Sequence, residues 1–201
     1  MHISEGVLSP AVLGAGAALT ALGTAVGLRR LDYDRIMTVA LLSAAFFVGS
    51  LVHIPVGVGS VHLVLNGLLG VLLGWAAFPA ILAALALQAL LFQYGGLTAL
   101  GVNTFTMAFG GVLAAWVYKT IIRISGRGLL RAAAFCGGAL GVALAGLFTA
   151  AAMTFSDESF LTAAELLLLA HLPVMLLEGV MTLFTVAFIA KARPEMLEIS
   201  E

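Results

Sequence analysis

Residues 7–35 read VLSPAVLGAGAALTALGTAVGLRRLDYDR, an uncharged and mostly apolar stretch that ends in a cluster of arginines and aspartates. A helix needs roughly 20 apolar residues to cross the hydrocarbon core of a bilayer, and the run from Val7 to Leu28 has that length. The charged cluster ends the run, because charged groups stay at the membrane surface where water solvates them. This stretch therefore predicts a membrane-spanning helix followed by a short polar loop.

The whole chain of 201 residues repeats this alternation of apolar runs and short charged loops. Hydrophobic residues make up 62% of the sequence and charged residues 9%, whereas a water-soluble domain has about 25% charged residues. We therefore predict an all-α polytopic membrane protein with a tight reversal at Phe78-Pro79. It is expected to form a single integral membrane domain over residues 1–201, with an N-terminal segment at 1–6 and seven spans at about 7–28, 36–52, 61–77, 79–94, 104–122, 132–155 and 163–190.

The basic residues predict an orientation. All nine Lys and Arg residues fall on one side of the membrane if the chain crosses it seven times. Cytoplasmic loops are enriched in Lys and Arg, so we expect an external N-terminus and a cytoplasmic C-terminus in the inner or plasma membrane of a prokaryote. The net charge of −1 and the lack of a long basic run give no indication of a nucleic-acid partner.

The N-terminus offers a set of metal ligands. It lacks the positive charge that begins a secretory signal peptide, so we expect no cleaved signal. The bulky second residue His2 normally protects an initiator Met from removal, so we expect Met1 to be retained with a free α-amine. This amine, the amide nitrogen between residues 1 and 2, and the His2 imidazole form two fused chelate rings. His62 can supply a fourth nitrogen if the N-terminal segment folds back into the outer mouth, and four planar nitrogens suit Ni(II), Cu(II) or low-spin Co(II). Alternatively, His2 is a polar residue at a frayed terminus and His62 an interfacial residue.

Two ionisable residues lie inside the last predicted span. His171 and Glu178 are seven residues apart, so they share one face of a helix near mid-membrane. Polar groups inside a membrane are costly, and they are functional candidates for that reason. Glu178 is a candidate for a group that supports a ligand or for a proton-linked residue.

Enzymatic signatures are missing from the sequence. It contains no His-Glu-x-x-His pair, no Gly-x-Ser-x-Gly elbow and no Walker loop. The sequence therefore favours a binding or transport protein that takes energy from a partner. A membrane scaffold or assembly protein with incidental histidines is the alternative, and an intramembrane enzyme is a more distant one.

Four blocks of sequence resemble the CbiM/NikM family, the substrate-capture (S) components of energy-coupling factor transporters for cobalt and nickel. In chain order they are MHISEGVLSP from Met1, IPVGVGSVH ending at His62, GGLTALGVNT from Gly95, and HLPVMLLEG from His171. The resemblance implies a seven-span fold with an external N-terminus. It also implies a separate transmembrane coupling (T) subunit, ATPase subunits and a small accessory membrane subunit.

The resemblance further implies the ligands of a Ni(II) or Co(II) ion, which would be the transported substrate. They are the terminal amine of Met1, the amide and imidazole nitrogens of His2, and His62. Many family members have Ser-His-Pro-Thr-Gly around the third-span histidine, whereas this chain has VHLVLNG, so the choice between nickel and cobalt stays open. No ligand role is implied for His53, and supporting roles are implied for Asn103, Thr104, His171 and Glu178.

Overall fold

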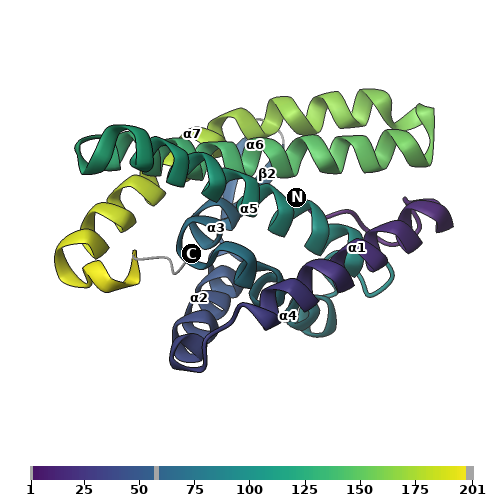
Figure 1. Cartoon of the computed structure of the whole chain (residues 1–201). Coiled ribbons are helices and arrows are strands. Elements are labelled where there is room, and N and C mark those ends of the chain that lie inside the picture. The colour runs from purple at the N-terminus through teal and green to yellow at the C-terminus, as the bar shows by residue number, and fades with distance from the viewer. Residues whose placement is uncertain (1, 57–58, 198–201) are drawn as a thin grey trace.

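The computed structural model describes residues 2–56 and 59–197. Within these residues the α6–α7 pair forms one long antiparallel layer, and α5 lies between this pair and the group formed by α1, α2 and α4 (Figure 1). The short helix α3 lies in the middle of this arrangement (Figure 1). The elements are α1 (Pro10–Arg29), α2 (Ile36–Gly49), β1 (His53–Val56), β2 (Gly59–His62), α3 (Asn66–Leu73), α4 (Ala77–Phe92), α5 (Leu100–Ser125), α6 (Leu130–Ser156) and α7 (Leu161–Ala192), joined in places by short 3-10 turns.

Helix α1 begins at Pro10, three residues after the predicted start, because Ser9 and Pro10 form a helix start signal. The Ser9 side chain accepts a hydrogen bond from the Val12 N–H at 3.5 Å. Proline suits the first helical position, where its missing N–H is not needed. The residues before Ser9 can therefore leave the helix axis, and the Ser9 N–H donates to Ser156 at the end of α6.

The predicted continuous span at residues 61–77 is wrong. A hairpin occupies its start, because β1 and β2 pair antiparallel with His53 opposite His62. Helix α3 follows and is only eight residues long. This hairpin is the one exception, among the described residues, to an otherwise helical chain.

The predicted reversal at Phe78-Pro79 is also misplaced. The break between α3 and α4 lies at Gly74, whose φ of +56° favours glycine. Pro79 is instead in the first turn of α4, where a helix needs no N–H from it.

Glycines let α3 approach its neighbours closely. All eight residues of α3 are buried. A Cβ atom at Gly70 would overlap the carbonyl of Gly111 on α5, and a Cβ atom at Gly141 on α6 would overlap the Cα of Gly67. Helices in lipid associate through such small residues rather than through hydrophobicity. Glycines on α5 and α6 therefore hold α3 between these two helices.

Polar side chains fix the start of α3. Asn66 donates from Nδ2 to the carbonyl oxygens of Met107 at 2.9 Å and Gly141 at 2.8 Å. The N–H groups of Val64 and Leu65 donate to the carboxyl group of Glu178 on α7, with 2.8 Å between Leu65 N and Oε1. Val64 and Leu65 are buried and come directly before the first residue of α3, so Glu178 pairs backbone N–H groups at the entry to this helix that would otherwise be costly to bury.

Four helical stretches in the described residues are long and apolar enough to cross a membrane: Pro10–Arg29, Asn66–Phe92, Leu100–Ser156 and Glu158–Ala192. Helix α2 has 14 residues and is shorter than a full span. Large apolar side chains cover the outer faces of the helices, as expected where lipid replaces water; examples are Leu41, Leu90, Trp116, Phe155, Phe184 and Phe188. The helical class is confirmed, apart from the hairpin, and the seven crossings stay a prediction.

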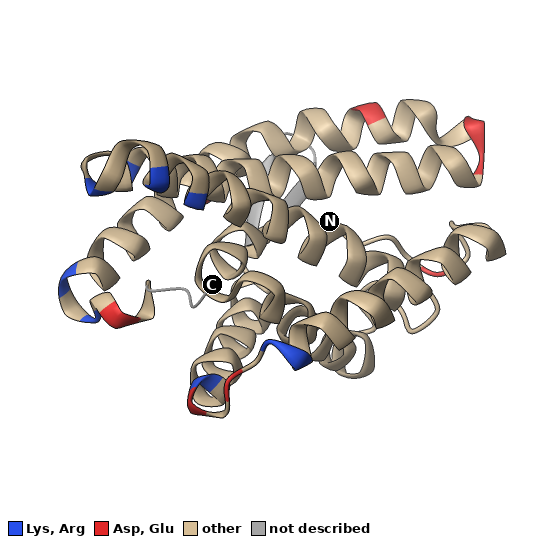
Figure 2. Cartoon of the chain, in the orientation of Figure 1, with Lys and Arg blue, Asp and Glu red and all other residues tan. Residues whose placement is uncertain are grey.

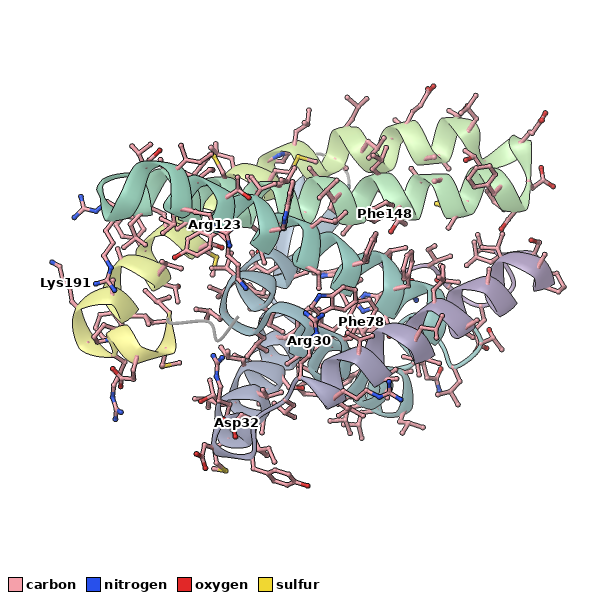
Figure 3. All side chains as sticks on the ribbon, viewed as in Figure 1. Arg30, Asp32, Phe78, Arg123, Phe148 and Lys191 are labelled. Atoms are coloured by element: carbon pink, nitrogen blue, oxygen red, sulfur yellow. The ribbon has the colours of Figure 1, made fainter. Side chains whose placement is uncertain are left out.

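Charged residues gather at the ends of the helices. Lys and Arg lie where α5 and α7 finish and again, with acidic residues beside them, at the connection from α1 to α2, whereas the turn between α6 and α7 is acidic (Figure 2). Arg123 lies near the end of α5 and Lys191 near the end of α7 (Figure 3). This distribution agrees with the basic loops that predicted the orientation, and the orientation itself stays a prediction.

Replacing Gly70 by Ala should destabilise the fold by about 1–3 kcal/mol, because overpacking a rigid contact has a cost of that size. The added methyl group would meet the Gly111 carbonyl. Gly14→Ala in α1 is the matched control, because a Cβ atom there meets nothing within 4 Å and alanine favours helices. Thermal unfolding in detergent, followed by tryptophan fluorescence, makes the comparison. Equal melting temperatures for the two variants would contradict the close packing of α3.

Candidate metal centre

The N-terminal segment docks into the fold through paired hydrogen bonds. The Ile3 N–H donates to Asn103 Oδ1 at 2.9 Å, and Asn103 Nδ2 donates back to the Ile3 carbonyl at 3.0 Å. Ile3 is buried and packs with Leu8 and Val102. Further along, the Glu5 carboxylate accepts from the Thr98 N–H at 3.1 Å. These contacts fix the backbone that carries His2.

The structure brings the two predicted histidines together. His2 Nδ1 lies 3.1 Å from His62 Nε2, although the residues are 60 positions apart. Two nitrogens that bind one ion at about 2.0–2.1 Å are about 2.8–3.4 Å apart, depending on the angle between the bonds. The spacing of these two ring nitrogens is therefore suitable for a shared metal ion.

His62 is held in the form that a metal requires. Its Nδ1 lies 2.8 Å from the Leu63 carbonyl oxygen, which can only accept, so Nδ1 carries the proton and Nε2 has the lone pair. Burial lowers the pKa of His62 from 6.5 to about 2, because a buried site disfavours the charged imidazolium. A neutral imidazole therefore faces His2.

Gln88 is a residue at this site that the sequence analysis missed. It is fully buried on α4, and its Oε1 lies 2.9 Å from His2 Nε2. An isolated amide in an apolar run resembles a helix-packing residue, so the pattern gave no signal. A cavity of about 170 Å³ opens beside the two imidazoles, and its lining is formed by His2, Ser4, Ser50, His62, Gln93, Tyr94 and Gly95.

The structure says little about two residues near the site, the predicted ligand Met1 and His53, for which no ligand role was predicted. Met1, the first predicted ligand, lies outside the described residues. His53 lies on β1 opposite His62 in the strand register, and only its backbone is described. Among the described residues, no three His, Cys, Asp or Glu side chains form one group.

The residues predicted to support the ligands lie on α5 and α7. Thr104 is buried on α5, and its hydroxyl has no hydrogen-bond partner in the described part of the chain. His171 is buried on α7, where Nδ1 donates to the Leu167 carbonyl at 2.7 Å. Glu178 bonds to backbone two and three residues after His62. Glu178 therefore contacts the segment that follows a predicted ligand.

Comparison of the sequence with known proteins identifies the family of this chain. Residues 2–196 match the CbiM family, described as the cobalt uptake substrate-specific transmembrane region. The chain belongs to the CbiM family. A Haemophilus influenzae relative named for metal transport is 42% identical over 205 residues, which cover 100% of this chain and 98% of the relative. The cobalt transport protein CbiM of Sorangium cellulosum is 32% identical over 98% of this chain and 95% of its own.

A solved structure supports the same relationship. A crystal structure described as a transition metal transporter matches with a TM-score of 0.84 and 29% identity, covering 95% of this chain and 93% of that one. Relatives include nickel as well as cobalt transport proteins. The resemblance found in the sequence is confirmed, and the chain is a membrane protein of the cobalt and nickel transport family. The CbiM family supplies a component of metal transport rather than a catalytic enzyme.

Asn103→Leu should release the N-terminal segment, because it removes both hydrogen bonds to Ile3 and leaves buried backbone groups unpaired, at about 1–3 kcal/mol each. A nitroxide on Ser4→Cys, in a Cys136→Ser background, should become more mobile. Thr106→Val is the control, because its hydroxyl bonds only to the Asn103 carbonyl of its own helix. Unchanged label mobility in Asn103→Leu would show that other contacts hold the segment.

Proposed function

We propose that this CbiM protein is the substrate-capture (S) component of an energy-coupling factor transporter that takes up Ni(II) or Co(II). The observation that carries the proposal is the 3.1 Å approach of His2 Nδ1 to His62 Nε2, in a chain of the cobalt and nickel transport family. The metal is the cargo, and a separate T subunit, separate ATPase subunits and a small accessory membrane subunit are the proposed partners.

The proposed site has four nitrogens in a square plane. The Met1 α-amine, the deprotonated amide of His2, His2 Nδ1 and His62 Nε2 are the proposed ligands. Fused five- and six-membered chelate rings at the terminus favour one plane, and such a nitrogen set suits Ni(II) or low-spin Co(II) rather than tetrahedral zinc. The docking of Ile3 onto Asn103 supports this site, because it fixes the backbone next to three of the four nitrogens.

We propose that the protein captures its metal from outside the cell. Basic residues gather where α5 and α7 finish and at the connection from α1 to α2 (Figure 2), and cytoplasmic loops are typically basic. In the proposed orientation the N-terminus is external, the C-terminus is cytoplasmic, and the protein lies in the plasma membrane of a prokaryote. Metal then passes inward when the ATPase subunits act through the T subunit.

One residue added before Met1 should abolish nickel binding, because it moves the free amine out of the chelate rings. His62→Ala should weaken binding by more than about 100-fold, since even residues that only support a ligand are worth about 10–100-fold. His53→Ala is the control and should bind like the wild type. Titration of purified protein with a native N-terminus, followed by the absorption of the nickel complex, measures all three.

The same titration separates the alternatives. A planar four-nitrogen nickel complex is yellow and diamagnetic, whereas a membrane scaffold with incidental histidines would take up no stoichiometric metal. Wild-type affinity in the extended variant would overturn the role of the terminus and leave the role of His62 to be judged from His62→Ala.

Nickel binding should weaken as the pH falls from about 8 to 6, because the metal displaces protons from the Met1 amine and the His2 amide. His62 adds no proton to this release, since its pKa is already lowered to about 2 and its ring is neutral over this range. Affinity therefore rises with pH. Calorimetry in two buffers of different ionisation enthalpy counts the protons released, and a count near zero would contradict the amine and amide ligands.

A further inference from the structure

Gln88 links the metal site to the packing of two helices. Its Oε1 lies 2.9 Å from His2 Nε2. On its other side, Nε2 contacts the Ser50 hydroxyl and lies 3.4 Å from the Phe47 carbonyl oxygen. Phe47 belongs to α2 and Ser50 follows its last residue, whereas Gln88 belongs to α4. One buried amide therefore joins His2 to the end of α2.

The partners of Gln88 determine which way its amide faces. A carbonyl oxygen only accepts hydrogen bonds, so the NH₂ group of Gln88 must face Phe47. This leaves the amide oxygen toward His2. An amide oxygen also only accepts, so His2 must donate from Nε2. A neutral imidazole has one N–H, so His2 Nδ1 keeps its lone pair. It then faces the lone pair of His62 Nε2 at 3.1 Å, an arrangement that a shared metal ion satisfies and a hydrogen bond between the two rings does not.

We propose that Gln88 is a positioning residue that holds His2 in its Nε2–H tautomer and so keeps Nδ1 available to the metal. The inference rests on the proposed function, because it concerns the ligand nitrogens of that site. Gln88 itself does not touch the metal. Gln88 accepts a hydrogen bond from His2, and the packing of α2 against α4 determines which end of its amide faces His2.

The link to α2 gives the site a means of regulation. If α2 moves away from α4, Gln88 loses the acceptors that orient its NH₂ group. The amide is then free to rotate and present NH₂ to His2 Nε2. Nε2 must accept in that arrangement, so the proton moves to Nδ1 and blocks the metal ligand. Ser43 on α2 also donates to the Ala80 carbonyl on α4 at 2.7 Å, so a second hydrogen bond joins the two helices whose separation would release Gln88.

Two substitutions of Gln88 separate positioning from packing. Gln88→Leu fills the space but cannot accept from His2, so nickel affinity should fall about 10–100-fold, the usual effect of a lost ligand support. Gln88→Glu keeps an acceptor and should bind nickel more tightly than Gln88→Leu. A role in packing alone predicts the opposite order, because a buried carboxyl group disturbs an apolar interior more than leucine does. That opposite order would overturn the proposal.

Ser50→Ala tests the connection to α2. It should weaken nickel binding in the wild-type background and have no further effect in the Gln88→Leu background, because the two residues act in one chain of hydrogen bonds. Equal effects of Ser50→Ala in both backgrounds would show that α2 does not act through Gln88. Thermal unfolding without metal accompanies each variant, so that lost affinity is compared among folded proteins.

A measurement without metal keeps the inference separate from the proposed function. Nitrogen-15 NMR of histidine-labelled, metal-free wild-type protein in lipid distinguishes protonated from unprotonated ring nitrogens, with His2 assigned by its loss in His2→Ala. We expect an Nε2–H tautomer in the wild type and a mixture in Gln88→Leu. An Nδ1–H form in the wild type would overturn the inference even if nickel binds. Failure of the wild type to bind nickel, with the tautomer as expected, would instead overturn the proposed function.

Discussion

A buried stretch of backbone must find acceptors for its N–H groups, because an unpaired N–H away from water costs free energy. In this protein the Glu178 carboxyl group on α7 accepts from Val64 and Leu65 at the start of α3. Each buried N–H left unpaired would cost about 1–3 kcal/mol. The contact joins α7 to the short segment between the hairpin, which ends at His62, and the helix α3.

The long helices could be predicted from the sequence because a helix in a membrane needs an apolar run of a definite length. Helices α5, α6 and α7 lie within a few residues of the predicted spans at 104–122, 132–155 and 163–190. The stretch at 61–77 was misread because its structure depends on Glu178, more than one hundred positions away. Apolar residues between His62 and Leu73 have the same composition whether they form one helix or a strand, a turn and a short helix, so local pattern could not separate the two.

At the site too, residues with a recognisable sequence pattern were predicted, and residues whose role depends on distant contacts were not. His2 and His62 were identified from chelate chemistry and from the resemblance of four sequence blocks, and the structure places their ring nitrogens 3.1 Å apart. Gln88 was not identified, because its contacts to His2 and Ser50 come from segments 86 and 38 positions away. Asn103 was found only as part of a block. Its two hydrogen bonds to the backbone of Ile3 hold the N-terminal segment in place. The residue type alone does not indicate this role.

The approach of His2 to His62 has a topological consequence. In the proposed complex one metal ion closes the first third of the chain into a ring that contains α1, α2 and the hairpin. Closing a ring of this size restricts the freedom of every element inside it, in the way that a cross-link between distant residues does. Loss of the ion opens the ring. The cargo would then act as a reversible cross-link, while the two hydrogen bonds between Ile3 and Asn103 hold the N-terminal segment whether or not the ion is bound.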